Sequence, residues 1–165
     1  MLTFDSVTPK DKGIIATLMI ESYEELLSTG QQFWQDQKNS WLRFDLDVFE
    51  NLTTIGQCVF LTRSDNNIIG FSSFDPRRGP LLGVIGHNCI LPRFRGQGFG
   101  KHQIQETLLR LQMRSIRKVI VSTSEHPFFI PAQRMYLACG FQETKRYSEI
   151  PPIGYQIIEY ELALS

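Results

Sequence analysis

The stretch "ILPRFRGQGFGKHQIQ", from Ile90 to Gln105, places three glycines at alternate positions between an apolar run and a helical pattern. These glycines are Gly96, Gly98 and Gly100. Glycine loses more conformational entropy on folding than other residues, so a cluster of glycines usually marks a special turn or a close approach to a ligand. The apolar run predicts a strand, so we expect the order strand, glycine loop, helix.

This order of elements favours an anionic ligand. The first turn of a helix leaves backbone N–H groups without partners, and their dipoles make that end positive. Glycines allow successive N–H groups to converge on one phosphate, and Arg93, Arg95 and Lys101 add positive charge nearby. The loop therefore predicts a phosphate-bearing ligand.

Two common phosphate loops do not fit the spacing. A nucleotide P-loop ends in Gly-Lys-Ser/Thr, whereas His102 follows Lys101 here. A dinucleotide fingerprint reads G-x-G-x-x-G in an opening βαβ unit, whereas this loop reads G-x-G-x-G and falls past the middle of the chain. From the glycines alone, a turn without function remains an alternative.

The surrounding sequence predicts a mixed α/β domain. A strand at "TFDSV" leads into a helix that Thr8 caps, with Pro9 at its first position, and a second helix follows Gly30. Two strands then flank the turn "SDNN", and the apolar strand before the glycine loop should be central and covered on both faces. Beyond the loop we expect a helix, a strand, a helix that ends at Gly140 and two strands, the last with alternating apolar and acidic residues.

These elements predict the fold class. They fit a single domain over residues 1–165, with a mixed, mostly antiparallel sheet of about seven strands and helices on both faces.

Composition limits the possible partners and sites. The chain has 165 residues, and 17 basic side chains balance 17 acidic ones, so nothing favours nucleic acid or an anionic membrane. No apolar run is long enough to span a bilayer, and the first residues do not resemble a signal peptide. Cys58, Cys89 and Cys139 are far apart, so we expect reduced thiols, no metal site and a cytoplasmic protein.

A second motif lies downstream, in "IPAQRMYLACGF" from Ile130 to Phe141. Ala132, Tyr136, Gly140 and Phe141 follow the pattern A-x-x-x-Y-x-x-x-G-F, and "RGQGFG" follows R-x-x-G-x-G. The two motifs, their separation and the order of elements resemble the GNAT superfamily of N-acetyltransferases over nearly the whole chain.

The resemblance implies acetyl-coenzyme A as cosubstrate and no metal. The loop would cradle the pyrophosphate of coenzyme A, and the backbone of the preceding strand would pair with the pantetheine arm as an added strand does. Ile90 and Leu91 would contact the pantetheine. The residues around the pyrophosphate would be Arg95, Gly96, Gln97, Gly98, Phe99, Gly100 and Lys101.

The resemblance also implies that a primary amine attacks the thioester directly and that Tyr136 is the general acid. A phenol, with a reference pKa of about 10, can protonate the leaving thiolate. The backbone N–H of Cys89 or Ile90 would stabilise the oxyanion. Helical spacing alone would equally suit a Tyr136 that packs at the protein edge.

The general base is not evident. The resemblance implies that Val84, Gly86 and Asn88 face the acceptor, and none of them is a base. Alternation puts His87 on the opposite face as a packed histidine, unless the strand contains a bulge. Water or a carboxylate of the first helices stays open, with three candidates: Glu21, Glu24 and Glu25.

Other segments depart from the family pattern or border the acceptor. Phe129 stands where many relatives have an asparagine, and Glu125 and His126 in "SEHPFFIPAQ" are candidate polar contacts, unless the segment is a rigid apolar loop. Cys139 is interpreted as a small core residue. The resemblance suggests two acceptor-lining segments, Ser28 to Gln37 and Ser148 to Gln156, while Trp34 and Trp41 share one core stripe.

Three functions remain open at this point. The first is an N-acetyltransferase with a small-molecule or peptide amine as acceptor. The second is the same kind of enzyme with a longer acyl group in place of acetyl. The rival is a non-catalytic module that binds acyl-coenzyme A, in which the loop would persist but a proton donor would not be needed. The presence of Tyr136 favours the enzyme. The alternating last strand could also pair across a homodimer.

Overall fold

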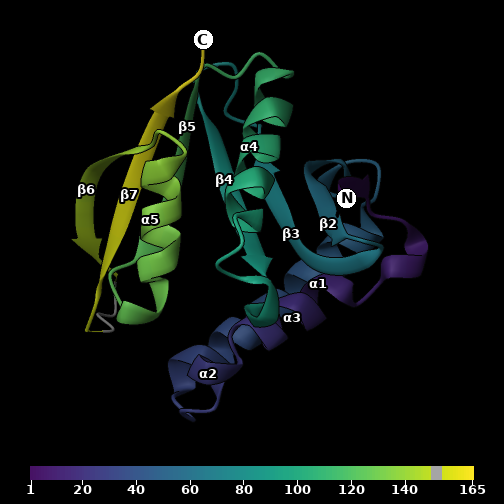
Figure 1. Ribbon diagram of the computed structural model, residues 1–165, viewed down its shortest axis with the longest axis vertical. Coiled ribbons are helices and arrows are strands. Elements are labelled where there is room, and N and C mark those ends of the chain that lie inside the picture. The colour runs from purple at the N-terminus through teal and green to yellow at the C-terminus, as the bar shows by residue number, and fades with distance from the viewer. Residues whose placement is uncertain (150–153) are drawn as a thin grey trace. The chain divides into compact units, whose positions relative to one another are not determined.

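The computed structural model describes residues 1–149 and 154–165 (Figure 1). Among these residues, seven strands form one sheet in the order β1-β2-β3-β4-β5-β7-β6. The strands are β1 (Leu2–Ser6), β2 (Val59–Ser64), β3 (Asn67–Asp75), β4 (Gly83–Ile90), β5 (Lys118–Ser124), β6 (Gln142–Ser148) and β7 (Gln156–Ala163). The α-helices are α1 (Ile14–Ser22), α2 (Glu24–Leu27), α3 (Gln32–Glu50), α4 (Phe99–Gln112) and α5 (Ile130–Ala138). Short 3-10 turns are η1 (Pro9–Asp11), η2 (Ile55–Cys58), η3 (Pro92–Phe94) and η4 (Pro127–Phe129).

The sheet is mixed because β4 and β5 run parallel. The pairs β1–β2, β2–β3, β5–β7 and β6–β7 are antiparallel. Parallel neighbours need a long crossover connection, and the segment with the glycine loop and α4 provides it. The predicted α/β class, the number of strands and the mostly antiparallel sheet are therefore confirmed.

The contacts divide the chain into two compact units, which we describe separately. Unit 1 comprises Met1–Ser73 and His87–Gln103, and unit 2 comprises Phe74–Gly86 and Ile104–Ser165. In the part of the chain that the structure describes, no helix is both long and apolar enough to cross a bilayer.

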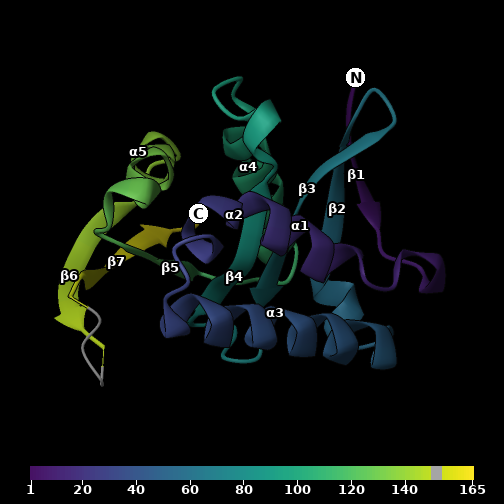
Figure 2. The ribbon, with the colours of Figure 1, turned by 90° about the horizontal axis from the view of Figure 1, so that it is seen from below.

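In unit 1, α1 and α3 lie side by side (Figure 2). Their apolar faces pack against one face of the strands, in a core that includes Trp41 of α3, Leu61 of β2 and Phe71 of β3. Asp65 and Asn66 join β2 to β3 with φ of 49° and 73°, and left-handed turns of this kind match the twist of a hairpin. The predicted hairpin is confirmed.

The start of the first helix differs from the prediction. Thr8 and Asp11 form a capping box, but it caps only the short turn η1, and α1 begins at Ile14. Gly13, with φ of 92°, redirects the chain between the two, and its N–H donates to the carboxylate of Asp45 on α3. The N–H groups at the start of α1 are thus bonded by a residue that is distant in the sequence.

In unit 2, α5 lies beside β6 and β7 (Figure 1). The predicted alternation in β7 is confirmed, because Ile158 and Tyr160 are buried while Glu159 and Glu161 are half-buried. All seven residues of β6, at the edge of the sheet, are exposed.

The central position of β4 is confirmed, but the expectation that both of its faces are covered is wrong in its middle. Gly86 is exposed, and His87 and Asn88 are half-buried. These three residues bring no apolar side chain that would favour burial.

Candidate functional site

The glycine loop leaves β4 through the turn η3 and enters α4. Gly96 and Gly98 have φ of 77° and 84°, in the left-handed region that favours glycine. Among the described residues, apart from each glycine and its two chain neighbours, no atom lies within 4 Å of the position that a Cβ would take at either residue. The backbone therefore faces open space at both glycines, while Gly100 lies in the first turn of α4.

The loop presents backbone donors to this space. Among the described residues, no acceptor is bonded to the N–H groups of Gly96, Gln97 and Gly98, which precede the helix. The side chains of Arg93, Gln97 and Lys101 are exposed around them. Unpaired N–H groups, a helix N-terminus and positive side chains form an arrangement that suits a phosphate.

Arg95 braces this loop. Its Nε donates to the carbonyl of Ile90 at 2.9 Å, and its Nη2 donates to the carbonyl of Ser22 at 2.9 Å. Ser22 is the last residue of α1, where a positive charge is favourable. Arg95 therefore ties the loop to the end of β4 and to α1.

Gln103 is a buried polar residue that the sequence interpretation missed. Its side chain is 1% exposed, its Nε2 donates to the carbonyl of Cys89 at 3.2 Å, and its Oε1 accepts from the hydroxyl of Thr62 at 2.6 Å. The sequence contained a signal, because Gln103, Thr107 and Leu111 follow one another at intervals of four and are all buried.

The residues at the end of β4 are apolar and buried. Ile90 and Leu91 are buried, and the N–H of Leu91 donates to the carbonyl of Ile69 at 2.7 Å. Burial raises the pKa of the Cys89 thiol to about 12, although the nearby Ser22 hydroxyl and Arg95 charge oppose the shift. Cys89 therefore remains a thiol at neutral pH and is not an activated nucleophile.

His87 packs against a helix. Its ring lies 5.1 Å from the ring of Phe44 on α3, centroid to centroid, and burial lowers its pKa. This is the placement expected for a packed histidine. The three candidate carboxylates, Glu21, Glu24 and Glu25, are exposed on α1 and α2.

In unit 2, Tyr136 belongs to the last turn of α5, and the spacing of its motif has a structural explanation. Gly140 has φ of 98°. The N–H of Phe141 donates to the carbonyl of Tyr136 at 3.1 Å, and that of Gly140 donates to the carbonyl of Leu137 at 3.0 Å. These bonds are a Schellman motif, which ends a helix through a left-handed glycine. Cys139, at the cap, is half-buried and not a full core residue.

The Schellman motif also fixes the ring of Tyr136. Phe141 contacts it edge-on with centroids 5.9 Å apart, and Tyr160 of β7 lies 5.8 Å away. The side chain of Tyr136 is 4% exposed. Tyr136, Phe141 and Tyr160 thus form an aromatic cluster in unit 2.

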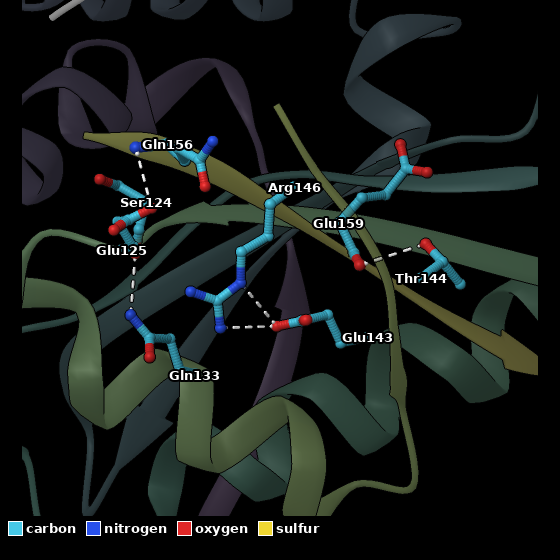
Figure 3. Close-up of polar contacts among 8 residues, drawn as sticks. All are labelled: Ser124, Glu125, Gln133, Glu143, Thr144, Arg146, Gln156 and Glu159. Carbon is cyan, nitrogen blue, oxygen red and sulfur yellow. Dashed lines mark hydrogen bonds and ion pairs between the residues drawn. The ribbon is translucent and has the colours of Figure 1, made fainter. Parts of the chain in front are cut away.

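The polar groups of "SEHPFF" stabilise the turn before α5. Nδ1 of His126 accepts from the N–H of Phe128 at 3.0 Å, and Glu125 accepts from the N–H of Gln156 at 3.1 Å. Figure 3 shows Gln133 of α5 reaching back to the carbonyl of Ser124, at 2.9 Å. The segment is therefore ordered by its own side chains, and Phe129 packs edge-on against Phe128.

The two expected acceptor-lining segments lie in different units. Ser28 to Gln37, in unit 1, contains the connection after α2 and the start of α3, and Trp34 and Trp41 are confirmed as core residues. Ser148 to Gln156 belongs to unit 2, and residues 150–153 of it lie outside the described residues. Within the described ranges, no group of three or more His, Cys, Asp or Glu side chains could hold a metal ion.

Comparison with known proteins gives a family match. The model of the "Acetyltransferase (GNAT) family" matches residues 17–141, which include both the glycine loop and Tyr136. A search of curated protein sequences gives no match.

Solved structures share the fold. A proposed acetyltransferase of the GNAT family from Desulfovibrio desulfuricans superposes with a TM-score of 0.79 at 15% identity, covering 100% of both chains. A proposed acetyltransferase from Salmonella typhimurium, solved with its cofactor acetyl-CoA, gives 0.73 at 14% identity, over 99% of this chain and 94% of the other. The ribosomal-protein-S18-alanine N-acetyltransferase from Escherichia coli gives 0.64 at 15% identity, over 100% of this chain and 95% of the other.

Proposed function

Because this chain belongs to the GNAT acetyltransferase family, we propose that it transfers the acetyl group of acetyl-coenzyme A to a primary amine. The observation that carries the proposal is the loop of unit 1. Its left-handed glycines face open space and present three unbonded N–H groups beside the N-terminus of α4. A Cβ would narrow that space at Gly96 or Gly98, so the loop fits a pyrophosphate.

Each part of the loop has a proposed role. The N–H groups from Gly96 to Lys101 would bind the pyrophosphate, together with the exposed side chains of Gln97 and Lys101. The backbone carbonyls of Ile90 and Leu91, each of which can accept a second hydrogen bond, would pair with the pantetheine arm, since the N–H of Leu91 already donates to Ile69. Arg95 would hold the loop in place. The bound acetyl-coenzyme A supplies an activated thioester.

Tyr136 would donate its phenolic proton to the sulfur that leaves. Two features support this role: the family motif contains the tyrosine, and the Schellman motif with Phe141 fixes the ring on α5. The acceptor nitrogen would lose its proton to water or to a carboxylate of α1 or α2. His87 is less suited, because its ring packs on Phe44.

The names of three solved relatives support a proposal for the acceptor class. One solved relative is a ribosomal-protein-S18-alanine N-acetyltransferase, another is the NatC complex bound to Gag peptide and CoA, and a third is a proposed phosphinothricin N-acetyltransferase. We propose that the acceptor here is also a small-molecule or peptide amine. A panel of an alanine-led peptide, the Gag peptide and phosphinothricin samples these classes.

The experiment measures thiol release from acetyl-coenzyme A over this panel. With an acceptor in hand, Tyr136→Phe should lower kcat by about 100-fold or more, the usual loss when a general acid is removed. Tyr160→Phe is the matched control, since it removes a hydroxyl from the neighbouring buried ring and should leave kcat within about threefold. Equal activity of Tyr136→Phe and the unaltered protein would show that another group donates the proton.

One observation favours the alternative of a non-catalytic acyl-coenzyme A-binding module. Tyr136 is 4% exposed and packs against Phe141 and Tyr160, as a purely structural tyrosine would. Calorimetry with acetyl-coenzyme A separates the two functions. Binding without thiol release for any amine supports the module, and binding with release supports the enzyme.

A further inference from the structure

A buried carboxamide beneath the glycine loop carries a further inference, which rests on the proposed function. Gln103 stands on the face of α4 whose other buried positions include Thr107, Ile104 and Leu111. Burial of an amide is costly unless its groups are hydrogen-bonded, and a leucine would fill this position without that cost. The carboxamide at Gln103 therefore calls for an explanation beyond packing.

The orientation of this carboxamide is fixed by its partners. The carbonyl of Cys89 on β4 can only accept, so the Nε2 group is the one that faces it, and the hydroxyl of Thr62 on β2 donates to Oε1 at 2.6 Å. Nε2 donates to the carbonyl of Cys89 at 3.2 Å. Gln103 thus connects α4 to two strands that are not adjacent in the sheet.

The strand between them is shaped to permit this contact. Thr62 pairs with Gly70 of β3 in the register of the hairpin. A Cβ at Gly70 would overlap the carbonyl oxygen of Cys89 and would stand 2.9 Å from Cδ1 of Ile90. The Cys89 carbonyl therefore occupies space over β3 that only a glycine leaves open.

The carbonyl of Cys89 and the N–H of Ile90 belong to one peptide unit. A trans peptide is planar, so its C=O and N–H point in opposite directions and rotate together. A bond that holds the Cys89 carbonyl over Gly70 therefore directs the Ile90 N–H away from β3. This N–H is one of the two backbone donors expected to meet the thioester oxygen.

We propose that Gln103 is a positioning residue that orients the Ile90 N–H toward the acetyl oxygen of acetyl-coenzyme A by holding the Cys89 carbonyl. Gln103 does not touch the cosubstrate itself. Its contribution depends on the acetyl carbonyl, which coenzyme A lacks. The structure therefore predicts a change in the discrimination between acetyl-coenzyme A and coenzyme A.

The test is calorimetric and uses both compounds as probes. Binding of acetyl-coenzyme A to the unaltered protein is the prior requirement, and its failure would refute the proposed function itself. Given binding, Gln103→Leu should weaken the binding of acetyl-coenzyme A by about three- to tenfold relative to the binding of coenzyme A. This is the usual contribution of one hydrogen bond. The Kd of coenzyme A should change by less than about twofold.

Two further variants make the result specific. Gln103→Met keeps the length of the buried side chain but removes the donor to Cys89, so it should lose the same discrimination. Thr62→Val leaves Gln103 in place but removes the hydroxyl that donates to its Oε1, so it should produce a smaller loss in the same direction. It replaces Gln103→Leu as the test if that variant does not fold. Ile104→Val is the core control and should lower stability without changing the ratio of the two Kd values.

The outcomes decide the proposal. A reduced ratio in the Gln103 and Thr62 variants, with unchanged binding of coenzyme A, supports it. An unchanged ratio, or an equal weakening of both compounds, overturns it and leaves Gln103 with a structural role alone.

Discussion

Gly98 and Gly30 both have a left-handed φ, of 84° and 74°, and each faces open space. An L-residue in this conformation is strained, so Gly98→Ala and Gly30→Ala should each lower the free energy of unfolding by about 1–2 kcal/mol. Only Gly98 belongs to the proposed pyrophosphate loop. Gly98→Ala should raise the Kd of acetyl-coenzyme A about tenfold or more, because the added methyl group narrows the loop. Gly30→Ala should leave this Kd unchanged, and calorimetry measures both values. Equal Kd values in both variants would contradict the proposed site.

His87 should give the stability of the protein a dependence on pH. Burial lowers its pKa in the folded state, so between that value and about 6.5 the unfolded chain binds the proton more readily. The free energy of unfolding should therefore be constant above about pH 6.5 with respect to this group and should decrease as the pH falls further. Urea unfolding at several pH values should show a smaller decrease in His87→Gln. A parallel decrease in the variant would assign the effect to other groups.

Helix α1 depends on a cap from another element. The carboxylate of Asp45, on α3, accepts from the N–H of Gly13 at 2.9 Å and from that of Ala16 at 3.0 Å, and it is 3% exposed. Asp45→Ala leaves two N–H groups without this acceptor and should cost about 1–3 kcal/mol in urea unfolding. Asp47→Ala, on the exposed side of the same helix, should stay within about 0.5 kcal/mol. Similar losses in both variants would mean that helix propensity, and not the cap, is responsible.

Whether the two units unfold together is a question for the whole molecule, and we propose that residues 1–165 act as one domain. Trp34 and Trp41 both belong to unit 1, so tryptophan fluorescence reports that unit, whereas far-UV circular dichroism reports all the helices and strands. For a single domain the two signals should follow one transition in urea. Saturating acetyl-coenzyme A, at about 100 times its Kd, should shift both by the same amount, about 2.7 kcal/mol. Separate transitions would show that the units unfold independently.

The sequence by itself determined the elements and both motifs, because their signals are local. The helical and alternating periodicities predicted the strands and most of the helices, the glycine loop is set by the conformations that glycine allows, and the spacing from Tyr136 to Phe141 is that of a Schellman cap. Only the tertiary structure decided the contacts that hold these pieces. Arg95 meets Ser22 across 73 residues of sequence, Thr62 meets Gln103 across 41, and Asp45 caps a helix 32 residues before it. No local propensity encodes such partners, since each bond exists only after the elements have packed, and the proposed role of Gln103 depends on one of them.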